Sequence, residues 1–448
     1  MNAELIARYA ARVPRYTSYP TAPHFHDGVD EAVYREWLGQ EADGSLSLYL
    51  HIPFCDRLCS YCGCHTKQVR RYDPIAAYLD VLNREIELVA GCLPERRKVS
   101  AIHFGGGSPT IVNPIDLQRL RDTLDRHFDI ASNAEISVEI DPTHVDAERL
   151  QAWRSLGITR ASVGVQDFEP IVQTAINRPQ SFEETADVVT TLRDLGVSSI
   201  NLDIVYGLPH QNKTMLLRTI EQCLSMAPDR IAMFGYAHVP WMKKHQSQID
   251  AATLAGPVER FEMVAAGAEA ILAAEYVAVG IDHFAKPGDC MAQKLSHGTL
   301  RRNFQGYTTD EADALIGFGA SSIGRLPQGY VQNITATGQY CRAILDGRLP
   351  VARGFSLSDG DRAAASAIED LMCSYAFSVS DLRSRFGRAA DAVVTDAMRA
   401  HLFNEDELTT FDGNTFAITP KGRPFVRAIA AKFDRYLDQG RAKHSIAV

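Results

Sequence analysis

From Leu46 onward, apolar strand-like runs alternate with amphipathic helical stretches at a spacing of roughly thirty residues. The expected strands lie near residues 46–54, 100–106, 135–141, 160–168, 199–207, 230–238 and 276–284. This alternation is typical of a parallel sheet flanked by helices, because parallel neighbours need a long crossover connection. The sequence therefore predicts an α/β fold, either doubly wound or a full or partial βα barrel.

Polar or glycine-rich residues stand at the carboxyl ends of six of these expected strands. They are Gly105 to Ser108, Glu139 and Asp141, Gln166 and Asp167, Asp203 and Tyr206, Tyr236 and His238, and Asp282 and His283. In a βα barrel these strand ends converge on one mouth. We therefore expect a polar site there, and the recurrence favours a barrel.

Four of the nine cysteines, Cys55, Cys59, Cys62 and Cys64, stand within ten residues directly after the first expected strand. The paired C-x2-C knuckles of structural zinc are missing, which disfavours a zinc or disulfide interpretation. Crowded thiolates suit a soft metal or an iron–sulfur cluster. If Cys55, Cys59 and Cys62 bind a [4Fe–4S] cluster, the fourth iron is left open to an exogenous molecule.

Composition limits the class of protein. The formal charge of −9 argues against nucleic acid as the main partner, and we interpret Lys243 to His245 as a solvated loop. The N-terminus lacks a secretory signal, and no run of eighteen apolar residues occurs. We expect a cytoplasmic protein without a membrane partner. The scattered cysteines are interpreted as structural thiols: Cys92, Cys223, Cys290, Cys341 and Cys373.

The two ends of the chain depart from the βα pattern. Residues 1–45 predict an irregular arm, either a surface strap or a lid, with a short helix around Val29 to Gly39. After Gly354 the expected elements are two helices in 356–387 joined near Ser378 to Ser380, a helix at 389–401, a hairpin turning at Asp412 and Gly413, and a helix from Gly422 to Leu437. This outline predicts a small, mostly helical, winged-helix-like domain that caps the barrel rather than binding DNA. The expected domains are 1–45, 46–354 and 355–448.

Several polar residues are candidates for ligand contact. Glu139 and Asp203 lie inside apolar strands, so each should face a cavity or have a partner, with Arg178 and Arg160 as the structural alternatives. The glycines after residue 104 could offer amide donors to a ligand. Arg178 is shaped to clamp a carboxylate. The remaining candidates are the polar linings His51, His238 and His283, a turn at 303–309, and a close-packed loop at 317–320.

The cysteine stretch resembles the signature of the radical S-adenosylmethionine (SAM) superfamily. Almost the whole chain resembles one of its families, the oxygen-independent coproporphyrinogen III oxidases. The matching segments are PRYTSYPTA at 14–22, the cysteine motif with Cys64, GGGSPT, VEIDP, GVQDF, NLDIVYGLP, YAHVP at 236–240, GIDHFAKP at 280–287 and RNFQGYTT at 302–309. Ser108 and Tyr61 stand where Thr and Phe are common, which keeps a hydroxyl and an aromatic ring.

The resemblance implies a partial (β/α)6 barrel and an oxidative decarboxylation. Two propionates of coproporphyrinogen III would become vinyl groups, giving protoporphyrinogen IX. A 5'-deoxyadenosyl radical from SAM would take one hydrogen from each propionate, and loss of CO2 and one electron would leave the vinyl. The reaction therefore needs a flavodoxin- or ferredoxin-type electron donor and an electron acceptor. We expect a monomer, because no coiled coil or apolar stripe demands a partner.

The resemblance also implies residue roles. Cys55, Cys59 and Cys62 would ligate the cluster, Tyr49, Gly106 and Glu139 would contact its SAM, and Ile323 would lie near the adenine. Residues matching a second SAM site are Gly107, Ser108, Gln166, Arg178, Asp203 and Ala237, with Gln305 in a nearby loop. Tyr49 and Cys64 are the catalytic candidates, Cys64 near the substrate. Two alternatives are a haem chaperone of the superfamily and a haem-degrading radical SAM methyltransferase.

Overall fold

The structure, a computed structural model, describes residues 3–10, 12–40 and 44–437. In these residues one twelve-stranded sheet has the order β16-β15-β14-β13-β1-β4-β5-β6-β7-β8-β10-β9. Its parallel centre consists of β1 (Leu46–Ile52), β4 (Lys98–Gly106), β5 (Asp129–Ile140), β6 (Arg160–Gln166), β7 (Ser199–Tyr206) and β8 (Arg230–Gly235). This is the partial (β/α)6 barrel that the family resemblance implies.

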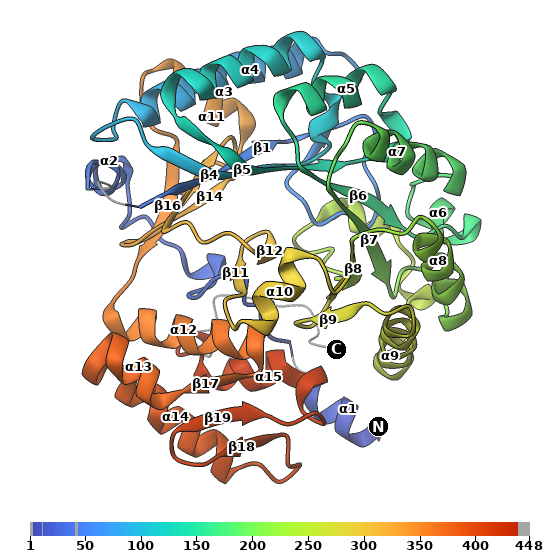
Figure 1. Ribbon diagram of the computed structural model, residues 1–448, viewed down its shortest axis with the longest axis vertical. Coiled ribbons are helices and arrows are strands. Elements are labelled where there is room, and N and C mark those ends of the chain that lie inside the picture. The colour runs from blue at the N-terminus through green and yellow to red at the C-terminus, as the bar shows by residue number, and fades with distance from the viewer. Residues whose placement is uncertain (1–2, 11, 41–43, 438–448) are drawn as a thin grey trace.

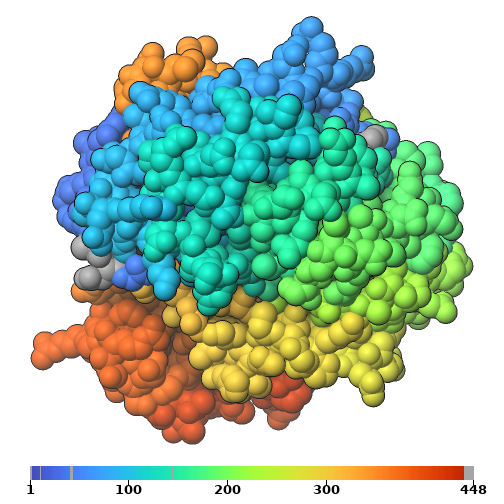
Figure 2. Space-filling model, turned by 45° about the horizontal axis from the view of Figure 1, so that its top comes forward, coloured from blue at the N-terminus to red at the C-terminus, as the bar shows by residue number. Residues whose placement is uncertain are grey.

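Helices cover the outer face of the sheet (Figure 1). They are α3 (Asp73–Ala90), α4 (Pro114–His127), α5 (Ala147–Leu156), α6 (Pro170–Ala175), α7 (Phe182–Asp194), α8 (Lys213–Ser225) and α9 (Pro257–Ala273). Figure 2 shows the cyan and green part of the chain on the face toward the viewer, with the orange and red C-terminal region below it.

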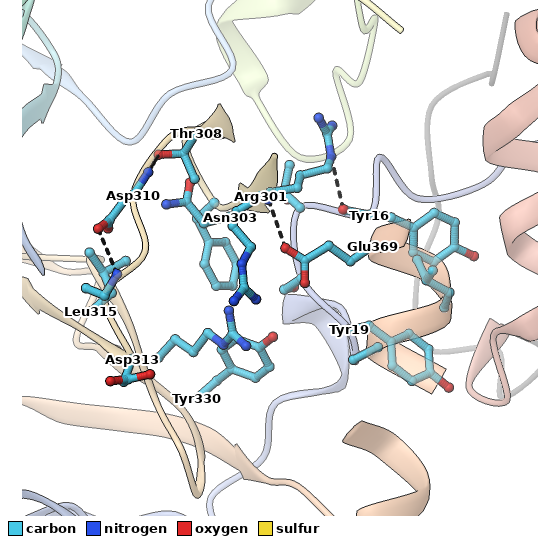
Figure 3. Close-up of a pocket in the computed structure, with 18 residues that line it drawn as sticks. Tyr16, Tyr19, Arg301, Asn303, Thr308, Asp310, Asp313, Leu315, Tyr330 and Glu369 are labelled. Carbon is cyan, nitrogen blue, oxygen red and sulfur yellow. Dashed lines mark hydrogen bonds between the residues drawn. The ribbon is translucent and has the colours of Figure 1, made fainter. Parts of the chain in front are cut away.

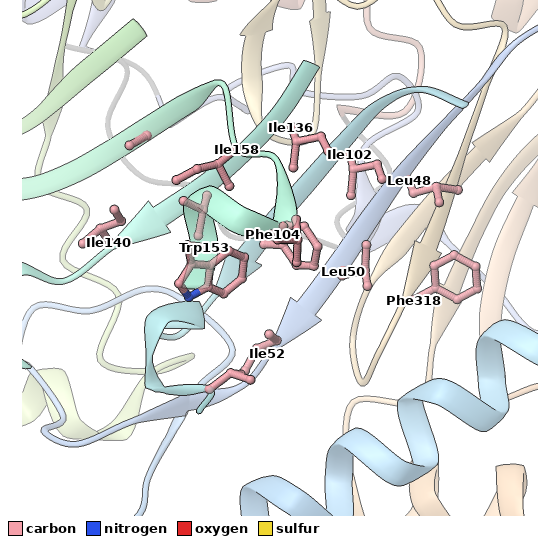
Figure 4. Close-up of a cluster of buried hydrophobic side chains, with 14 of the residues drawn as sticks. Leu48, Leu50, Ile52, Ile102, Phe104, Ile136, Ile140, Trp153, Ile158 and Phe318 are labelled. Carbon is pink, nitrogen blue, oxygen red and sulfur yellow. The ribbon is translucent and has the colours of Figure 1, made fainter. Parts of the chain in front are cut away.

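The main core lies between the strands and these helices. Leu48, Leu50 and Ile52 of β1 are fully buried in it, and the Phe104 and Trp153 rings meet edge to face at 5.0 Å (Figure 4). Burial of one such side chain stabilises the fold by about 1.5–3 kcal/mol. Because side chains alternate along a strand, the same packing directs Tyr49 and His51 to the opposite face of β1.

The two edges of the sheet differ from the sequence prediction. The strand expected near 276–284 is wrong as a single strand, because the chain turns at Gly280 with a φ of +59° between the antiparallel β9 (Val277–Val279) and β10 (His283–Ala285). The opposite edge was not predicted. It consists of β13 (Ala314–Phe318), parallel to β1, and of the antiparallel β14 (Ile323–Leu326), β15 (Gly329–Asn333) and β16 (Val351–Ser356). Strands this short form because they pair and pack with neighbouring strands, so their own sequence pattern does not predict them.

Small elements connect these parts. Residues 303–309 form the turn and second strand of a hairpin, β11 (Arg301–Asn303) with β12 (Gly306–Thr308). The remaining elements here are α2 (Glu31–Gly39), β2 (Phe54–Cys55), β3 (Lys67–Gln68), α10 (Cys290–Ser296) and α11 (Thr337–Leu345). The helix expected around 29–39 is confirmed, with the Asp30 side chain accepting from Val33 N at its start.

The C-terminal region is mostly helical, as predicted. It contains α12 (Asp359–Ser374), α13 (Val379–Phe386), α14 (Asp391–Leu402) and the hairpin β18 (Thr409–Phe411) and β19 (Thr415–Ile418), to which an unpredicted β17 (Ala376–Ser378) adds a third strand. The helix expected from Gly422 to Leu437 is wrong in length. Only α15 (Val426–Ala430) is α-helical, because tighter 3-10 turns flank it at 423–425 and 431–433.

The N-terminal residues join the core of the C-terminal region. α1 (Ala3–Tyr9) was not predicted, and Figure 1 shows it beside α15. Leu5, Ile6, Val13, Tyr16 and Tyr19 are buried in this second core. The first part of the arm therefore belongs to the core of the C-terminal region, whereas Tyr34, Trp37 and Leu38 of α2 are buried in the main core. The boundaries 1–45, 46–354 and 355–448 stay a prediction, and residues 1–2, 11, 41–43 and 438–448 of these ranges lie outside the described residues.

Candidate active site

The cysteine loop, residues 55–67, starts where β2 follows β1, and β3 pairs in parallel with β2 to close it. Loops that follow β6 and β8 hold it from the other side. Ser60 N donates to Ile176 O at 2.8 Å, and Gln246 Nε2 donates to Tyr61 O at 2.8 Å. Lys243 Nζ donates to Cys64 O at 2.9 Å, and His245 Nε2 lies 2.7 Å from Cys62 O.

The expected solvated loop at Lys243 to His245 therefore has a structural role. Lys243 and His245 both bind main-chain oxygens of the cysteine loop, about 180 residues earlier in the chain. Sequence reasoning missed this contact, since no local pattern marks a side chain that binds a distant carbonyl.

Each of the three motif thiols has a hydrogen-bonding neighbour. All nine cysteines are free. Cys59 Sγ accepts from Arg178 Nη1 at 3.6 Å, Cys62 Sγ accepts from Cys64 N at 3.4 Å, and Cys55 Sγ lies 3.1 Å from Thr66 Oγ1. Hydrogen bonding from Cys64 lowers the pKa of Cys62 to about 7, whereas burial raises the pKa of Cys55 to about 12. N–H donors to sulfur are a common feature around iron–sulfur clusters.

Within the described residues, no three His, Cys, Asp or Glu side chains are grouped closely enough to hold one metal ion. A cluster of several irons spaces its thiolates farther apart than a single ion does, because each thiolate binds a different iron. Three thiols on one loop, two of which accept hydrogen bonds from N–H groups, are the donor chemistry that an iron–sulfur cluster uses.

Next to the loop, β1, β4 and β5 bring their polar side chains together. Tyr49 Oη lies 2.9 Å from His51 Nδ1, and His51 Nε2 lies 2.8 Å from His65 O. Since a carbonyl only accepts, Nε2 carries the proton and Nδ1 accepts from Tyr49. Burial lowers the pKa of His51 to about 4, so the ring is neutral at physiological pH. The Tyr49 ring stacks on His103 at 5.8 Å.

The side chain of Glu139 is held in place by Gly106 and His103. Its carboxylate accepts from Gly106 N at 3.0 Å and lies 3.4 Å from His103 Nε2. Burial raises the pKa of Glu139, but His103 and Gly106 outweigh burial and hold the pKa below its usual value. The site therefore presents a negative charge, and neither Arg178 nor Arg160 pairs with it. Arg160 pairs with Glu135 instead.

The amides of the glycine segment are already bonded. Gly106 N donates to Glu139, Gly107 N donates to Ile52 O at 2.9 Å, and Ser108 N donates to Phe54 O at 2.8 Å. The segment thus ties the cysteine loop to the sheet rather than offering these N–H groups to a ligand. Gly106 has a φ of +119°, and a Cβ there would lie 2.7 Å from the His51 ring.

Asp203 and Arg178 also have protein partners. Asp203 accepts from Ser162 Oγ at 2.7 Å and from Asn201 Nδ2 at 2.8 Å, and burial raises its pKa in spite of both bonds. Arg178 is 7% exposed and forms a bidentate pair with Asp141 at 2.9 and 3.1 Å. The carboxylate that Arg178 clamps in this structure is the protein's own.

One cavity of about 290 Å³ collects six of the predicted site residues. Tyr49, Cys64, Gly106, Glu139, Gln305 and Ile323 line it, and so does His51, one of the expected polar linings. The predicted residues that do not line this cavity are the cluster ligands Cys55, Cys59 and Cys62 and the second-SAM candidates Gly107, Ser108, Gln166, Arg178, Asp203 and Ala237. Phe304, in the candidate turn at 303–309, also lines the cavity. Sequence reasoning missed the lining residues His65, Leu315, Ser321 and Ser322. Of these, only His65 had a signal in the sequence, because it is next to Cys64.

Comparisons with known proteins agree with this geometry. Residues 49–223 match the radical SAM superfamily. A protein of Bradyrhizobium diazoefficiens named oxygen-independent coproporphyrinogen III oxidase is 48% identical over the full length of both chains, and one of that name from Pseudomonas aeruginosa is 38% identical over 97% of this chain and 96% of its own.

A solved structure extends the match to the fold. The coproporphyrinogen III oxidase of Escherichia coli, described as a radical SAM enzyme, has a TM-score of 0.91 and 33% identity, and the match covers 95% of this chain and 100% of that one. The barrel, the cap and the cysteine loop of this chain therefore follow one shared plan. The chain belongs to the oxygen-independent coproporphyrinogen III oxidase family of radical SAM proteins.

Proposed function

We propose that this protein oxidatively decarboxylates two propionates of coproporphyrinogen III to vinyl groups, giving protoporphyrinogen IX. The proposal depends on the name shared by full-length relatives at up to 48% identity. The observation that carries it is the cavity in which Tyr49, Cys64, Gly106 and Glu139 meet beside the cysteine loop. These names favour the oxidase over a haem chaperone or a haem-degrading methyltransferase.

Radical SAM proteins use a [4Fe–4S] cluster and SAM, which together supply a 5'-deoxyadenosyl radical. In our proposal Cys55, Cys59 and Cys62 hold the cluster, and the side chains of the adjoining cavity hold SAM. The charged Glu139 suits the cationic parts of SAM, and Ile323 offers an apolar contact for the adenine. The neutral His51 orients the Tyr49 hydroxyl at the wall.

A second SAM site extends this proposal. Its residues are Gly107, Ser108, Gln166, Arg178, Asp203, Ala237 and Gln305. Gln166 supports such a site, because it ends β6 with a φ of +66°, a strained conformation that is common at binding sites. Arg178 takes part through the Asp141 carboxylate that it fixes.

The balance of the reaction requires two redox partners. Each propionate loses CO2, one hydrogen atom to the deoxyadenosyl radical and one electron. We propose a flavodoxin- or ferredoxin-type protein as the reductant and a separate acceptor for the last electron. We also propose that the protein works as a cytoplasmic monomer. In the described part of the chain, no helix is both long and apolar enough to cross a membrane.

Anaerobic turnover tests the proposal. The protein with its cluster reconstituted should convert coproporphyrinogen III, SAM and a reductant to protoporphyrinogen IX, with one 5'-deoxyadenosine for each propionate, measured by chromatography. Cys59→Ser should lose iron and both products, whereas Cys341→Ser, on α11, should keep them. An intact cluster that yields neither 5'-deoxyadenosine nor decarboxylated porphyrin would refute the assignment.

A further inference from the structure

A second, smaller cavity adjoins the main one. It measures about 70 Å³, and Phe304 and Leu315 line both cavities. Its other walls come from the N-terminal arm, the β11–β12 hairpin, β14, β15 and α12 (Figure 3). The two cavities therefore share a wall at the hairpin, although no proposed cofactor residue lines the smaller one.

The strand β14 continues from one cavity to the other. Ile323 and Arg325 are two residues apart and thus lie on one face of the strand, Ile323 lining the main cavity and Arg325 the smaller one. Arg325 pairs in register with Tyr330 of β15. Arg301 enters the smaller cavity from β11, and its side chain points toward Tyr330 (Figure 3). The two guanidinium groups thus come from two different strands, Arg301 from β11, which pairs with β12, and Arg325 from β14, which pairs with β15.

These two arginines differ from their neighbour Arg302. The Arg302 guanidinium donates to the carbonyls of Arg15 and Tyr16 at 3.1 and 3.2 Å and lies 4.3 Å from the centre of the Tyr307 ring. Among the described residues, neither Arg301 nor Arg325 has an ion pair or a side-chain hydrogen bond. Arg302 is structural, while the other two can accept a partner.

The carboxylates of the smaller cavity leave these two guanidinium groups available. Asp310 accepts from the Ser47 hydroxyl and from Ala312 N, and Glu369 accepts from Arg302 N at 2.9 Å. Asp313 is exposed, and the structure shows no ion pair between it and either arginine. Main-chain and hydroxyl donors thus hold Asp310 and Glu369 without using Arg301 or Arg325.

We infer that the smaller cavity is a carboxylate subsite, in which Arg301 and Arg325 bind a propionate of the porphyrinogen other than the reacting one. This inference depends on the proposed function. A volume of about 70 Å³ takes a carboxylate-sized group but not a macrocycle. Guanidinium groups bind carboxylates through two parallel hydrogen bonds. A remote anchor of this kind fixes which propionate faces the radical source in the main cavity.

Substrate kinetics of arginine variants test the subsite. Arg301→Gln and Arg325→Gln should each raise the KM for coproporphyrinogen III about 10- to 100-fold, since each removes a charged hydrogen-bonding partner. Iron content and SAM affinity should not change. Arg385→Gln, which loses an exposed pair with Asp381 on α13, is the matched control and should keep the wild-type KM.

Equilibrium binding gives a readout that does not need turnover. Coproporphyrin III, followed by its fluorescence, should bind the Arg325→Gln variant about 10-fold or more weakly than the wild type. Its tetramethyl ester lacks carboxylates, so the wild type and the variant should bind the ester equally. A wild-type protein that binds the porphyrin with this pattern but forms no product would contradict the proposed function and leave the subsite standing.

Other results would overturn the inference. One is a double variant, Arg301→Gln with Arg325→Gln, whose KM stays within twofold of an active wild type. Another is a KM for coproporphyrinogen III that rises in Arg423→Gln but not in the Arg301 and Arg325 variants. Arg423 lines a separate cavity of about 240 Å³ with Arg15, Arg260 and Arg427, and that result would place the carboxylate there.

Discussion

Cys64 differs from the other three crowded cysteines in its surroundings. Its thiol lines the main cavity with Tyr49 and Glu139, while its main-chain N–H donates to Cys62 Sγ at 3.4 Å. The residue therefore lines the main cavity and supports the motif both through its backbone N–H and through its thiol, whose hydrogen bond lowers the pKa of Cys62. A serine at this position keeps the backbone contact and replaces the thiol donor with a hydroxyl.

We predict that Cys64→Ser keeps the iron content of the wild type and lowers turnover about 10-fold or more, as expected for the loss of one group that acts in the reaction. Cys62→Ser should lose iron. Iron analysis and the anaerobic assay measure both effects. If Cys64→Ser also loses its iron, Cys64 is a cluster ligand and our assignment is wrong.

The helix α3 holds two strands of the sheet at the site. Tyr78 Oη donates to His51 O at 2.7 Å and accepts from Ala320 N at 2.9 Å. Two turns further along, the fully buried Glu85 accepts from Gly319 N and from the Tyr340 hydroxyl. Burial raises the pKa of Glu85 to about 7, although these donors oppose the shift. The helix thus places a group that titrates near neutrality between β13 and α11.

The raised pKa predicts a pH-dependent stability. The folded protein holds the Glu85 proton more tightly than the unfolded chain does, so the bound proton adds to the free energy of unfolding. This stabilisation is complete below the unfolded pKa of 4.5 and is lost as the pH rises through about 7. The loss is at most about 3 kcal/mol. Glu85→Gln should make the free energy of unfolding less dependent on pH between 5 and 8.5, measured by urea unfolding.

A control on the same helix isolates this effect. Glu87 is paired with Arg84 at the surface, and Glu87→Gln should keep the wild-type pH dependence. Equal slopes with pH in wild type and Glu85→Gln would contradict the assignment of the titration to Glu85.

At the scale of the whole molecule, the N-terminal arm joins the barrel to the cap. Leu5 and Ile6 are buried with Phe425 and Leu371 in the second core. Further on, Arg15 Nη2 donates to Gly235 O at the end of β8, at 2.7 Å. The N-terminal arm and the C-terminal region thus form one folded unit against the mouth of the barrel, where the Tyr16 to Tyr19 segment reaches the smaller cavity.

We predict that Ile6→Ala, at a side chain 2% exposed, destabilises the protein by about 2–5 kcal/mol through the cavity that it leaves. Ile115→Ala, the same change on α4 at a side chain 74% exposed, should have an effect within about 0.5 kcal/mol. Denaturant unfolding measures both. Equal stabilities of the two variants would show that the arm does not belong to the folded core.

Local patterns were enough to predict much of this protein. The alternation of strand and helix patterns predicted where the six parallel strands lie in the chain, because each βα unit is a local, self-consistent stretch of sequence. The spacing of Cys55, Cys59 and Cys62 identified the superfamily. Glu139 was recognised because a carboxylate inside an apolar strand requires a cavity or a partner.

Only the tertiary structure decided which of these residues meet. The edge strands β13 to β16 are short and obtain their form from neighbouring strands, so their sequence predicted neither Arg325 beside Ile323 nor Leu315 at both cavities. The pairing of Arg178 with Asp141 and the contacts of Lys243 and His245 join residues far apart in the chain. A sequence pattern records which face a side chain takes, but contact across the barrel depends on strand order and register, which the whole fold sets together.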